Sequence, residues 1–350
     1  MSFYNKYRPS SFSDIKGKSA EILSKQIESN KTTHAYIFAG PPGTGKTTMA
    51  RVAAVEMISK DDSKLKKLIL ENNHPDVYEI NCAVNNGVDN IRDNIIQLAR
   101  LAPTMGKYKI FILDEAHMLT TQAQTSLIKI TEEPPASVKF FFCTTDPQKI
   151  LRAIQTRCQL FLMKKLSNND LFDILLDVCN KEKLDFENSA LHLIANQSDG
   201  SAREALSILE QISVFDFVSE ENVRELLNIS PKNIAYNLAR SISNLDRTES
   251  CRIIQAAHSE GRNLSNLILE TSKIYMVAFQ YILFKVKKVD RVPEIEHLAR
   301  TVKSMHLVEI AEQLYNLFCN IRQTVSEDII SMTGILKIID YYAKYNCVEE

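Results

Sequence analysis

The sequence predicts an α/β domain with a parallel five-stranded sheet, followed by a small helical domain and an all-α C-terminal domain. In the first half, short apolar runs rich in β-branched or aromatic residues alternate with helical segments, which is typical of a parallel sheet covered on both faces. The strand pattern ends after Leu166, and helical patterns continue to Tyr345. At 350 residues the chain is also too long for one core of ordinary size. We therefore expect domains at residues 1–166, 167–229 and 230–350.

The expected sheet strands are compact and nearly continuous in apolar character. They are Tyr36–Ala39, Val77–Ile80, Lys109–Leu113, Lys139–Thr144 and Gln159–Leu162. Helical stretches separate them, among them Lys46–Ser59, Val88–Ala99, Thr121–Glu132 and Ile150–Arg157.

The helical half begins at Ser167–Asp170, which has the composition of a helix N-cap. Helices are expected at Leu171–Cys179, Asn188–Ala195 and Arg203–Val214, with a turn at Asp199–Ser201 and a break at Ile229–Pro231. In the C-terminal domain, Gly261, Pro293 and Gly334 are expected to interrupt the helices. The apolar runs Ile274–Phe284 and Ile310–Phe318 fit either a monomer core or an interface between subunits.

Composition favours an ordinary globular protein of a reducing compartment. Hydrophobic residues make up 45% and charged residues 24%, with a net charge of −1, so any nucleic-acid contact would need a local basic patch. The seven cysteines are scattered without a C-x-x-C pair, which argues against disulfides and zinc. The N-terminus lacks the apolar segment of a secretion signal, and Ile274–Phe284 is shorter than a bilayer span. We expect a cytoplasmic protein with no membrane association.

A glycine-rich loop after the first expected strand carries the main chemical signal. It fits the pattern G-x-x-x-x-G-K-[ST] through Gly40, Pro41, Pro42, Gly43, Thr44, Gly45, Lys46 and Thr47, with Thr48 next. Gly43 and Gly45 allow backbone N–H groups to turn inward around phosphates, and the following helix adds its positive N-terminus. Lys46 can reach the β- and γ-phosphates, and the Thr47 hydroxyl can bind Mg²⁺. The pattern predicts a nucleoside triphosphate site.

Two acidic residues follow the strand Lys109–Leu113. Asp114 emerges at the carboxyl end of the strand, where open α/β sheets bind ligands, and can hold the Mg²⁺ shell. Glu115 is suited to orient and deprotonate an attacking water as a general base. The pair therefore predicts hydrolysis of the bound triphosphate.

His117 completes the string Asp-Glu-Ala-His, which suggests a helicase. The chain shows neither a second RecA-like domain nor the arginine-rich motif that such helicases need. His117 is interpreted as a structural residue at a helix start.

The strand Lys139–Thr144 ends in the hydroxyl of Thr144. That hydroxyl fits two roles equally well, contact with the γ-phosphate or the attacking water, and a turn built on Thr145-Asp146-Pro147. Arg157 and Arg203 would each be ordinary surface charges if spacing were the only guide.

Together these motifs resemble the AAA+ ATPase subunits of DNA clamp loaders, nearest to the bacterial gamma/tau subunit, with some features of the small subunits of replication factor C. The resemblance covers about the first 215 residues. The strings that carry it are Tyr7-Arg8-Pro9, Gly40–Thr47, Asp114–Leu119, Glu132–Pro135, Thr144–Lys149, Arg157-Cys158 and Gly200–Leu206.

The resemblance implies a role for each matching residue. Tyr7, Arg8 and Pro9 lie on the adenine side of ATP. Thr144 is the sensor 1 residue, and Arg203 is the sensor 2 residue, which reaches from the lid to the nucleotide of the same subunit. Arg157, preceded here by Thr156 in place of the family's serine, is an arginine finger that acts on the ATP of a neighbouring subunit. Arg92 and Lys149 contact template phosphates.

The implied function is that of an ATP-hydrolysing motor subunit that opens a sliding clamp and loads it onto primer–template DNA. The implied cofactors are ATP and Mg²⁺, and hydrolysis is stimulated by DNA and by the clamp. The implied partners are the clamp and the other loader subunits in a pentameric assembly, held together by a C-terminal collar. Two alternatives remain. One is another AAA+ ATPase acting on replication forks or in recombination, and the other is a stator subunit without catalysis.

One departure from the bacterial gamma/tau pattern concerns zinc. Those subunits carry a four-cysteine module after the phosphate-loop helix, whereas residues 59–75 of this chain contain no cysteine. We therefore expect no zinc at this position.

Overall fold

A computed structural model describes residues 2–59, 62–91, 95–215, 217–227, 232–284, 292–321 and 326–346. The chain divides into two compact units, Met1–Glu220 and Glu221–Glu350. The predicted domain limits at 166 and 229 stay predictions, and the expected break at Ile229–Pro231 lies outside the described residues.

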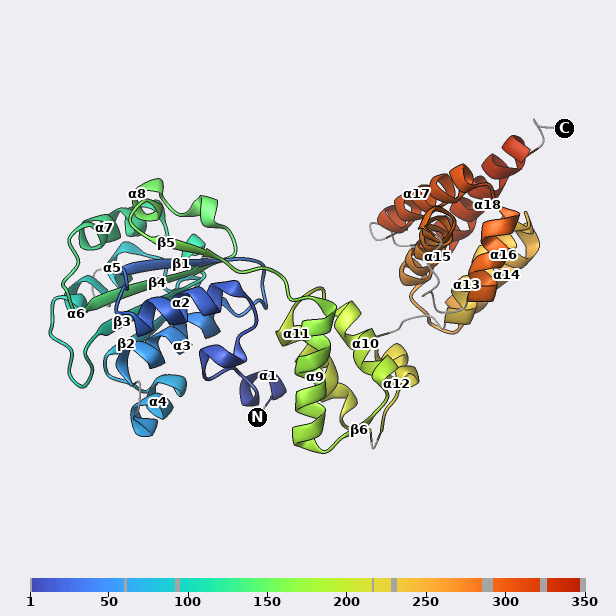
Figure 1. Ribbon diagram of the computed structural model, residues 1–350. Helices are drawn as coiled ribbons and strands as arrows, with labels where there is room; N and C mark the ends of the chain where they lie inside the picture. Colours follow the sequence, from blue (N-terminus) through green and yellow to red (C-terminus); the bar gives the residue numbers. More distant parts are fainter. Residues whose placement is uncertain are drawn as a thin grey trace. The chain divides into compact units, whose positions relative to one another are not determined.

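The first unit is built on a five-stranded sheet in which every neighbouring pair of strands is parallel, in the order β2-β3-β4-β1-β5 (Figure 1). Its strands are β1 (Ala35–Ala39), β2 (Val77–Asn81), β3 (Lys109–Asp114), β4 (Val138–Thr144) and β5 (Gln159–Leu162). Each expected strand is present to within one residue at either end. The predicted α/β class with a parallel five-stranded sheet is therefore confirmed.

Helices cover both faces of this sheet, as the continuous apolar strands require. On one face α2 (Lys18–Glu28), α3 (Lys46–Ile58) and α4 (Ser63–Leu70) pack on side chains such as Phe38 and Phe141. On the other face α5 (Val88–Ile91), α6 (Gln97–Ala99), α7 (Thr121–Glu132) and α8 (Arg152–Gln155) pack on side chains such as Phe111 and Phe140. Successive side chains of a strand point to opposite faces of the sheet, so alternate residues pack into two separate apolar cores.

The stretch Val88–Ala99 is helical at α5 and α6, and residues 92–94 between these two elements lie outside the described part. Another expected helix is shorter than predicted. The stretch Ile150–Arg157 contains only the four residues of α8, preceded by the short 3₁₀ helix η4 (Pro147–Lys149). Other short elements of this region are α1 (Phe3–Lys6), η1 (Phe12–Asp14) and η3 (Ala116–Met118).

The last part of the first unit is a small helical lid. It contains α9 (Asn168–Glu182), α10 (Asn188–Gln197) and α11 (Ala202–Ile212). Ser167 caps α9 in a capping box with Asp170, as its sequence predicts. The expectation that no strand follows Leu166 is wrong, because β6 (Asp185–Phe186) and β7 (Phe217–Val218) form a two-stranded parallel ladder.

The second unit is helical throughout its described residues. It contains α12 (Glu220–Leu226), most of which belongs to this unit, α13 (Lys232–Ser243), α14 (Arg247–Ser259), α15 (Leu264–Phe284), α16 (Val292–Thr301), α17 (Ser304–Ile321) and α18 (Glu327–Asn346). Gly261 ends α14 with a positive φ of 69°, as expected. Gly334 does not interrupt a helix. It lies inside α18, where a Cβ atom would come within 2.4 Å of Leu317, so glycine is needed for close packing on α17.

Helix α15 contains the apolar run Ile274–Phe284 but is almost twice as long. Among the described residues it is the one helix long and apolar enough to cross a membrane by length and composition. This is weak evidence, because core helices pass the same test, and one face of α15 is buried in the core of the second unit.

Candidate functional site

The phosphate loop connects β1 to α3 and lines a cavity of about 350 Å³. Gly43 and Gly45 have φ angles of +74° and +89°, a backbone region that favours glycine. The Lys46 ammonium donates hydrogen bonds to the carbonyls of Gly40 (3.0 Å) and Pro41 (2.9 Å). Burial lowers the pKa of Lys46, against the nearby Glu115, Cys143 and Asp114, which raise it.

Thr47 and Asp114 come together at the carboxyl ends of the strands. The Thr47 hydroxyl donates to Asp114 Oδ1 at 2.9 Å, and the same oxygen accepts from the Glu115 backbone N–H at 3.2 Å. Both side chains line the cavity beside Lys46. A hydroxyl and a carboxylate placed next to a phosphate-binding loop are the donor set that Mg²⁺ takes when it also binds substrate phosphates. The residues present therefore fit this ion.

Glu115 also lines the cavity, from a strained backbone position. Its φ and ψ are 52° and 43°, in the left-handed region, and its side chain is 40% exposed. Glu115 Oε2 lies 3.4 Å from His117 Nδ1. Non-glycine residues held in this region cost about 1–3 kcal/mol and cluster at functional sites.

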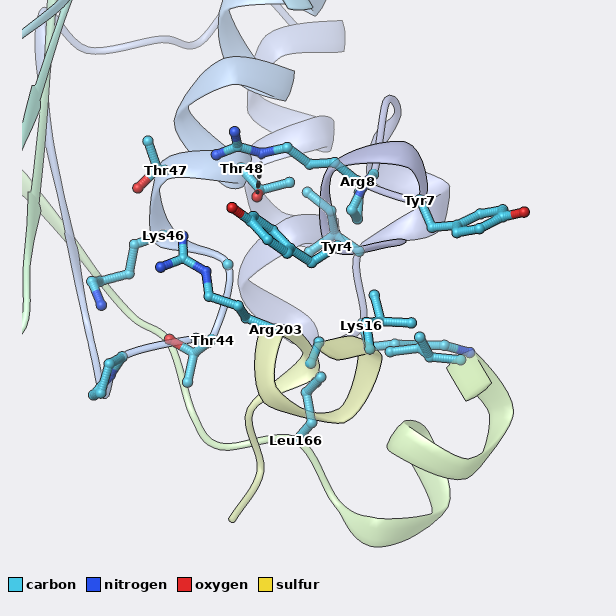
Figure 2. A pocket seen from close by; sticks show the side chains of 18 of the residues that line it. Tyr4, Tyr7, Arg8, Lys16, Thr44, Lys46, Thr47, Thr48, Leu166 and Arg203 are labelled. Carbon is cyan, nitrogen blue, oxygen red and sulfur yellow. Dashed lines mark hydrogen bonds between the residues drawn. The ribbon is translucent and has the colours of Figure 1, made fainter. Parts of the chain in front are cut away.

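The N-terminal segment and the lid close the other side of the cavity. Figure 2 shows Tyr4, Arg8 and Arg203 converging near Thr48, whereas the Tyr7 ring points away from them. The Arg8 guanidinium donates to the Thr48 hydroxyl at 3.0 Å, and Arg203 lies over the Tyr4 ring, 5.5 Å from its centroid.

The charge of this region suits a polyanion. Burial lowers the pKa of Arg8, and the like charges of Arg51 and Arg203 act in the same direction, against Glu79 and Asp114. Burial is the main cause of the lowered pKa at both Arg8 and Lys46, so both positive charges are partly removed from water at the cavity. A bound triphosphate would place negative charge beside these two desolvated cations.

Helix α1 is attached to the lid by polar contacts. The Phe3 backbone N–H donates to Glu210 at 3.0 Å, and Lys6 and Tyr7 both donate to Glu182 Oε1, at 2.6 and 2.7 Å. The adenine-side segment predicted from Tyr7-Arg8-Pro9 is thereby connected to α9 and α11.

Most predicted site residues line this cavity. They are Tyr7, Arg8, Pro9, Pro42, Gly43, Thr44, Gly45, Lys46, Thr47, Thr48, Asp114, Glu115 and Arg203. Gly40 and Pro41 contact the Lys46 ammonium through their carbonyls. Sequence reasoning missed Tyr4, Asn5, Asp14, Ile15, Lys16, Leu166, Ile174, Ala202 and Leu206, which also line it. Ile174 and Leu206 belong to the amphipathic pattern of α9 and α11, so their apolar character was visible but their place at the site was not.

Besides Gly40 and Pro41, three predicted residues within the described ranges are absent from the cavity lining, namely Thr144, Arg157 and Lys149. Thr144 is fully buried at the end of β4, and its hydroxyl accepts from the Asp146 N–H at 3.0 Å. Arg157 donates to the Ala153 carbonyl and forms an ion pair with Glu132. Lys149 is 65% exposed, 3.6 Å from Asp146. Arg92 lies outside the described residues.

Within the described ranges, no group of three or more His, Cys, Asp or Glu side chains is suited to hold a metal ion. The expectation of no zinc at residues 59–75 stays a prediction.

The fold and the site together define a class of protein. A parallel sheet in the order β2-β3-β4-β1-β5 carries a phosphate loop after β1 and an Asp-Glu pair after β3, and a helical lid supplies Arg203. This is the arrangement of an AAA+ nucleotide-binding protein. The RuvB Holliday junction branch migration motor of Thermotoga maritima has a similar fold, with a TM-score of 0.50 and 19% identity over 67% of this chain and 79% of that one.

Sequence comparison narrows the class to a family. Residues 15–167 match the family model described as DNA polymerase III, delta subunit, and residues 172–214 match the clamp loader subunit ATPase lid domain of DNA polymerase III. Over these residues the chain belongs to the clamp-loader ATPase family of bacterial DNA polymerase III.

Two relatives extend the similarity into the second unit. DNA polymerase III subunit gamma/tau of Mycoplasma genitalium is 35% identical over 296 residues, which is 81% of this chain and 49% of the relative. DNA polymerase III subunit tau of Bacillus subtilis is 32% identical over 280 residues, 77% of this chain and 50% of the relative. The chain spans about half the length of these relatives.

Proposed function

We propose that this protein is the ATP-hydrolysing motor subunit of a DNA sliding-clamp loader. The observation that carries the proposal is the convergence of Lys46, Thr47, Asp114 and Glu115 on one cavity that Arg203 of the lid also lines. This convergence supports binding of a triphosphate and activation of water within one subunit. This argues against a stator that binds no nucleotide.

Each cavity residue takes a specific role in the proposal. The loop N–H groups and Lys46 bind the β- and γ-phosphates, and Glu115 orients and deprotonates the attacking water. Thr47 and Asp114 would hold Mg²⁺, which when bound neutralises charge that develops on the phosphate oxygens. Arg203 extends from the lid to the nucleotide and couples the position of the lid to nucleotide binding. Tyr7, Arg8 and Pro9 lie on the adenine side.

Arg157 is the residue that links hydrolysis to assembly. It does not line the cavity of its own subunit, so we infer that it acts as an arginine finger on the ATP of a neighbouring subunit. An isolated subunit should consequently hydrolyse ATP slowly. The helical second unit would form the collar of a pentameric, cytoplasmic assembly that receives primer–template DNA, with Arg92 and Lys149 on template phosphates.

The competing reading is another AAA+ ATPase that acts on forks or in recombination. The similarity to gamma/tau subunits over 77–81% of the chain favours the clamp loader, because the likeness to RuvB reflects the fold alone.

The test is ATP hydrolysis by the wild-type chain, with and without the loader's other subunits, a sliding clamp and primed DNA. Stimulation that requires both clamp and primed DNA is expected. Lys46→Ala should abolish nucleotide binding, because it removes the cation that neutralises the phosphates. Hydrolysis that responds to branched DNA and ignores the clamp would refute the proposal in favour of the fork ATPase.

A further inference from the structure

The side chain of His117 lies between two residues of the proposed reaction, and neither the fold nor the phosphate loop explains this placement. His117 belongs to η3, just after β3, and Thr144 ends the neighbouring strand β4. His117 Nδ1 is 3.2 Å from the Thr144 hydroxyl and 3.4 Å from Glu115 Oε2. One ring nitrogen therefore contacts both.

Thr144 needs an intermediary to influence the cavity. Its side chain is fully buried, and it is absent from the residues that line the cavity. Its hydroxyl oxygen already accepts the Asp146 N–H, so its own proton is free to be donated. The His117 ring is 13% exposed and stands between this buried hydroxyl and a carboxylate that is 40% exposed.

The Glu115 carboxylate needs support for a different reason. Its backbone is held in the left-handed region, a strained conformation that the surrounding structure must maintain, and its side chain is 40% exposed and so only partly held by packing. A general base must be held within hydrogen-bond reach of the water that it deprotonates. His117 Nδ1, 3.4 Å from Glu115 Oε2, is placed to supply such a restraint at the edge of the cavity.

We propose that His117 is a positioning residue for the general base Glu115 and couples it to the end of β4 through Thr144. Nδ1 can receive the Thr144 proton or direct its own proton toward Glu115, so the two contacts compete for one atom. A shift at the end of β4 therefore changes the restraint on Glu115. His117 itself touches no nucleotide, and the proposal rests on the proposed function, because it concerns hydrolysis.

The test compares three substitutions of His117 in the full chain assembled with the other loader subunits, clamp and primed DNA. The amide nitrogen of Asn lies near the position of Nδ1, whereas that of Gln lies near Nε2. His117→Asn should retain most of kcat, and His117→Gln and His117→Ala should lower it about 10- to 100-fold, a part of the ~10²–10⁴-fold that general-base catalysis supplies. The Kd of a fluorescent ATP analogue should stay within about twofold of the wild-type value, because no contact to the nucleotide is lost.

Two controls separate positioning from a merely structural role. Met118→Ala alters an exposed side chain of the same short helix and should leave kcat unchanged. Thr144→Val combined with His117→Ala should lower kcat no further than the more harmful single substitution, because residues that act as a unit are not additive.

The failures of this proposal and of the proposed function differ. Normal kcat in His117→Ala would overturn the positioning role alone, and so would equal loss in the Asn and Gln variants that parallels a loss of thermal stability. A wild-type chain that binds ATP but does not hydrolyse it in the complete assembly would refute both.

Discussion

Replacing Gly43 by alanine should destabilise the first unit more than the same replacement at Gly45, although both glycines belong to one loop. Both have positive φ, +74° and +89°, so alanine is strained at either position. Around Gly45 nothing lies within 4 Å of an added Cβ. At Gly43 the added Cβ would lie 1.9 Å from Ser201 Oγ and 2.7 Å from Ser201 Cβ.

The cost of backbone strain, which both variants share, can be separated from the cost of the clash, which only Gly43→Ala has. Strain in the left-handed region costs about 1–2 kcal/mol at each position. Rotation of the Ser201 hydroxyl cannot relieve the clash at Gly43, because Ser201 Cβ is itself too close. Ser201 must move, and it is the N-cap of α11, where its hydroxyl accepts the Glu204 N–H. The two possible costs of the clash are alternatives: displacing Ser201 far enough loses the cap, at about 1 kcal/mol, whereas a smaller displacement leaves an overpacked contact, at about 1–3 kcal/mol. Gly43→Ala should therefore cost about 1–3 kcal/mol more than Gly45→Ala.

Calorimetry of the nucleotide-free full chain measures this difference as a shift in Tm. For a unit of this size 1 kcal/mol corresponds to about 2–4 °C, so Gly43→Ala should melt about 2–12 °C below Gly45→Ala. The shift is expected whether Ser201 or the whole lid moves, since either movement loses contacts of α11.

Ser201→Gly supplies the matched rescue. Glycine at an N-cap costs only a few tenths of a kcal/mol, and it removes both clashing atoms. Adding it to Gly43→Ala should raise the Tm to about the Gly45→Ala value. Equal Tm values for the two alanine variants, or no rescue by Ser201→Gly, would refute the contact between the phosphate loop and the lid.

Three further predictions concern assembly, pH and metal. Arg157→Ala should leave ATP binding intact but lower stimulated hydrolysis about 10³-fold or more in the complete assembly, and normal turnover there would exclude the finger role. Burial acts to raise the pKa of Asp76, but the N–H groups of residues 104–106 and then His74 together hold that pKa below its ordinary value. The ionised form of Asp76 therefore stabilises the fold fully above about pH 4, and this stabilisation is lost as the pH falls through the lowered pKa. Urea unfolding should show Asp76→Asn to be less stable than the wild type by about 1–3 kcal/mol at pH 7, with a difference that becomes smaller in acid. A difference in unfolding free energy that does not change with pH would count against the ionised contact. Chelators should leave the melting of the region 59–75 unchanged, and stoichiometric zinc found by metal analysis would contradict this expectation.

The strands and the phosphate loop could be predicted because their signals are local. The three central strands β1, β3 and β4 are nearly continuous apolar runs that are buried along their length, and Gly43 to Thr47 combine a turn and a helix start within a few residues. The two-residue strands β6 and β7 are too short to show any period in the sequence. Gly334 alone predicts a break in the helix, yet glycine occurs there because its lack of a side chain allows close packing against Leu317 of another helix.

The closed side of the cavity could not be predicted, because it depends on residues far apart in the chain. Tyr4 meets Arg203 and Phe3 meets Glu210 only after the lid has folded against the N-terminal segment. No periodicity or spacing connects such pairs. The family resemblance supplied a role for Arg203 but none for Tyr4.

Arg157 and Arg203 show how the structure adds to a resemblance that treats both as nucleotide contacts. Arg203 lines the cavity, while Arg157 pairs with Glu132, away from the residues that line it. This ion pair does not prevent a role in trans, because its side chains are 31% and 44% exposed and such surface pairs contribute only about 0–1 kcal/mol. A finger that accelerates hydrolysis ~10³–10⁵-fold supplies about 4–7 kcal/mol in the transition state, well above the cost of leaving Glu132. Under the proposed finger role, the pair would hold Arg157 in the separate subunit and release it at an interface, which would make hydrolysis depend on assembly.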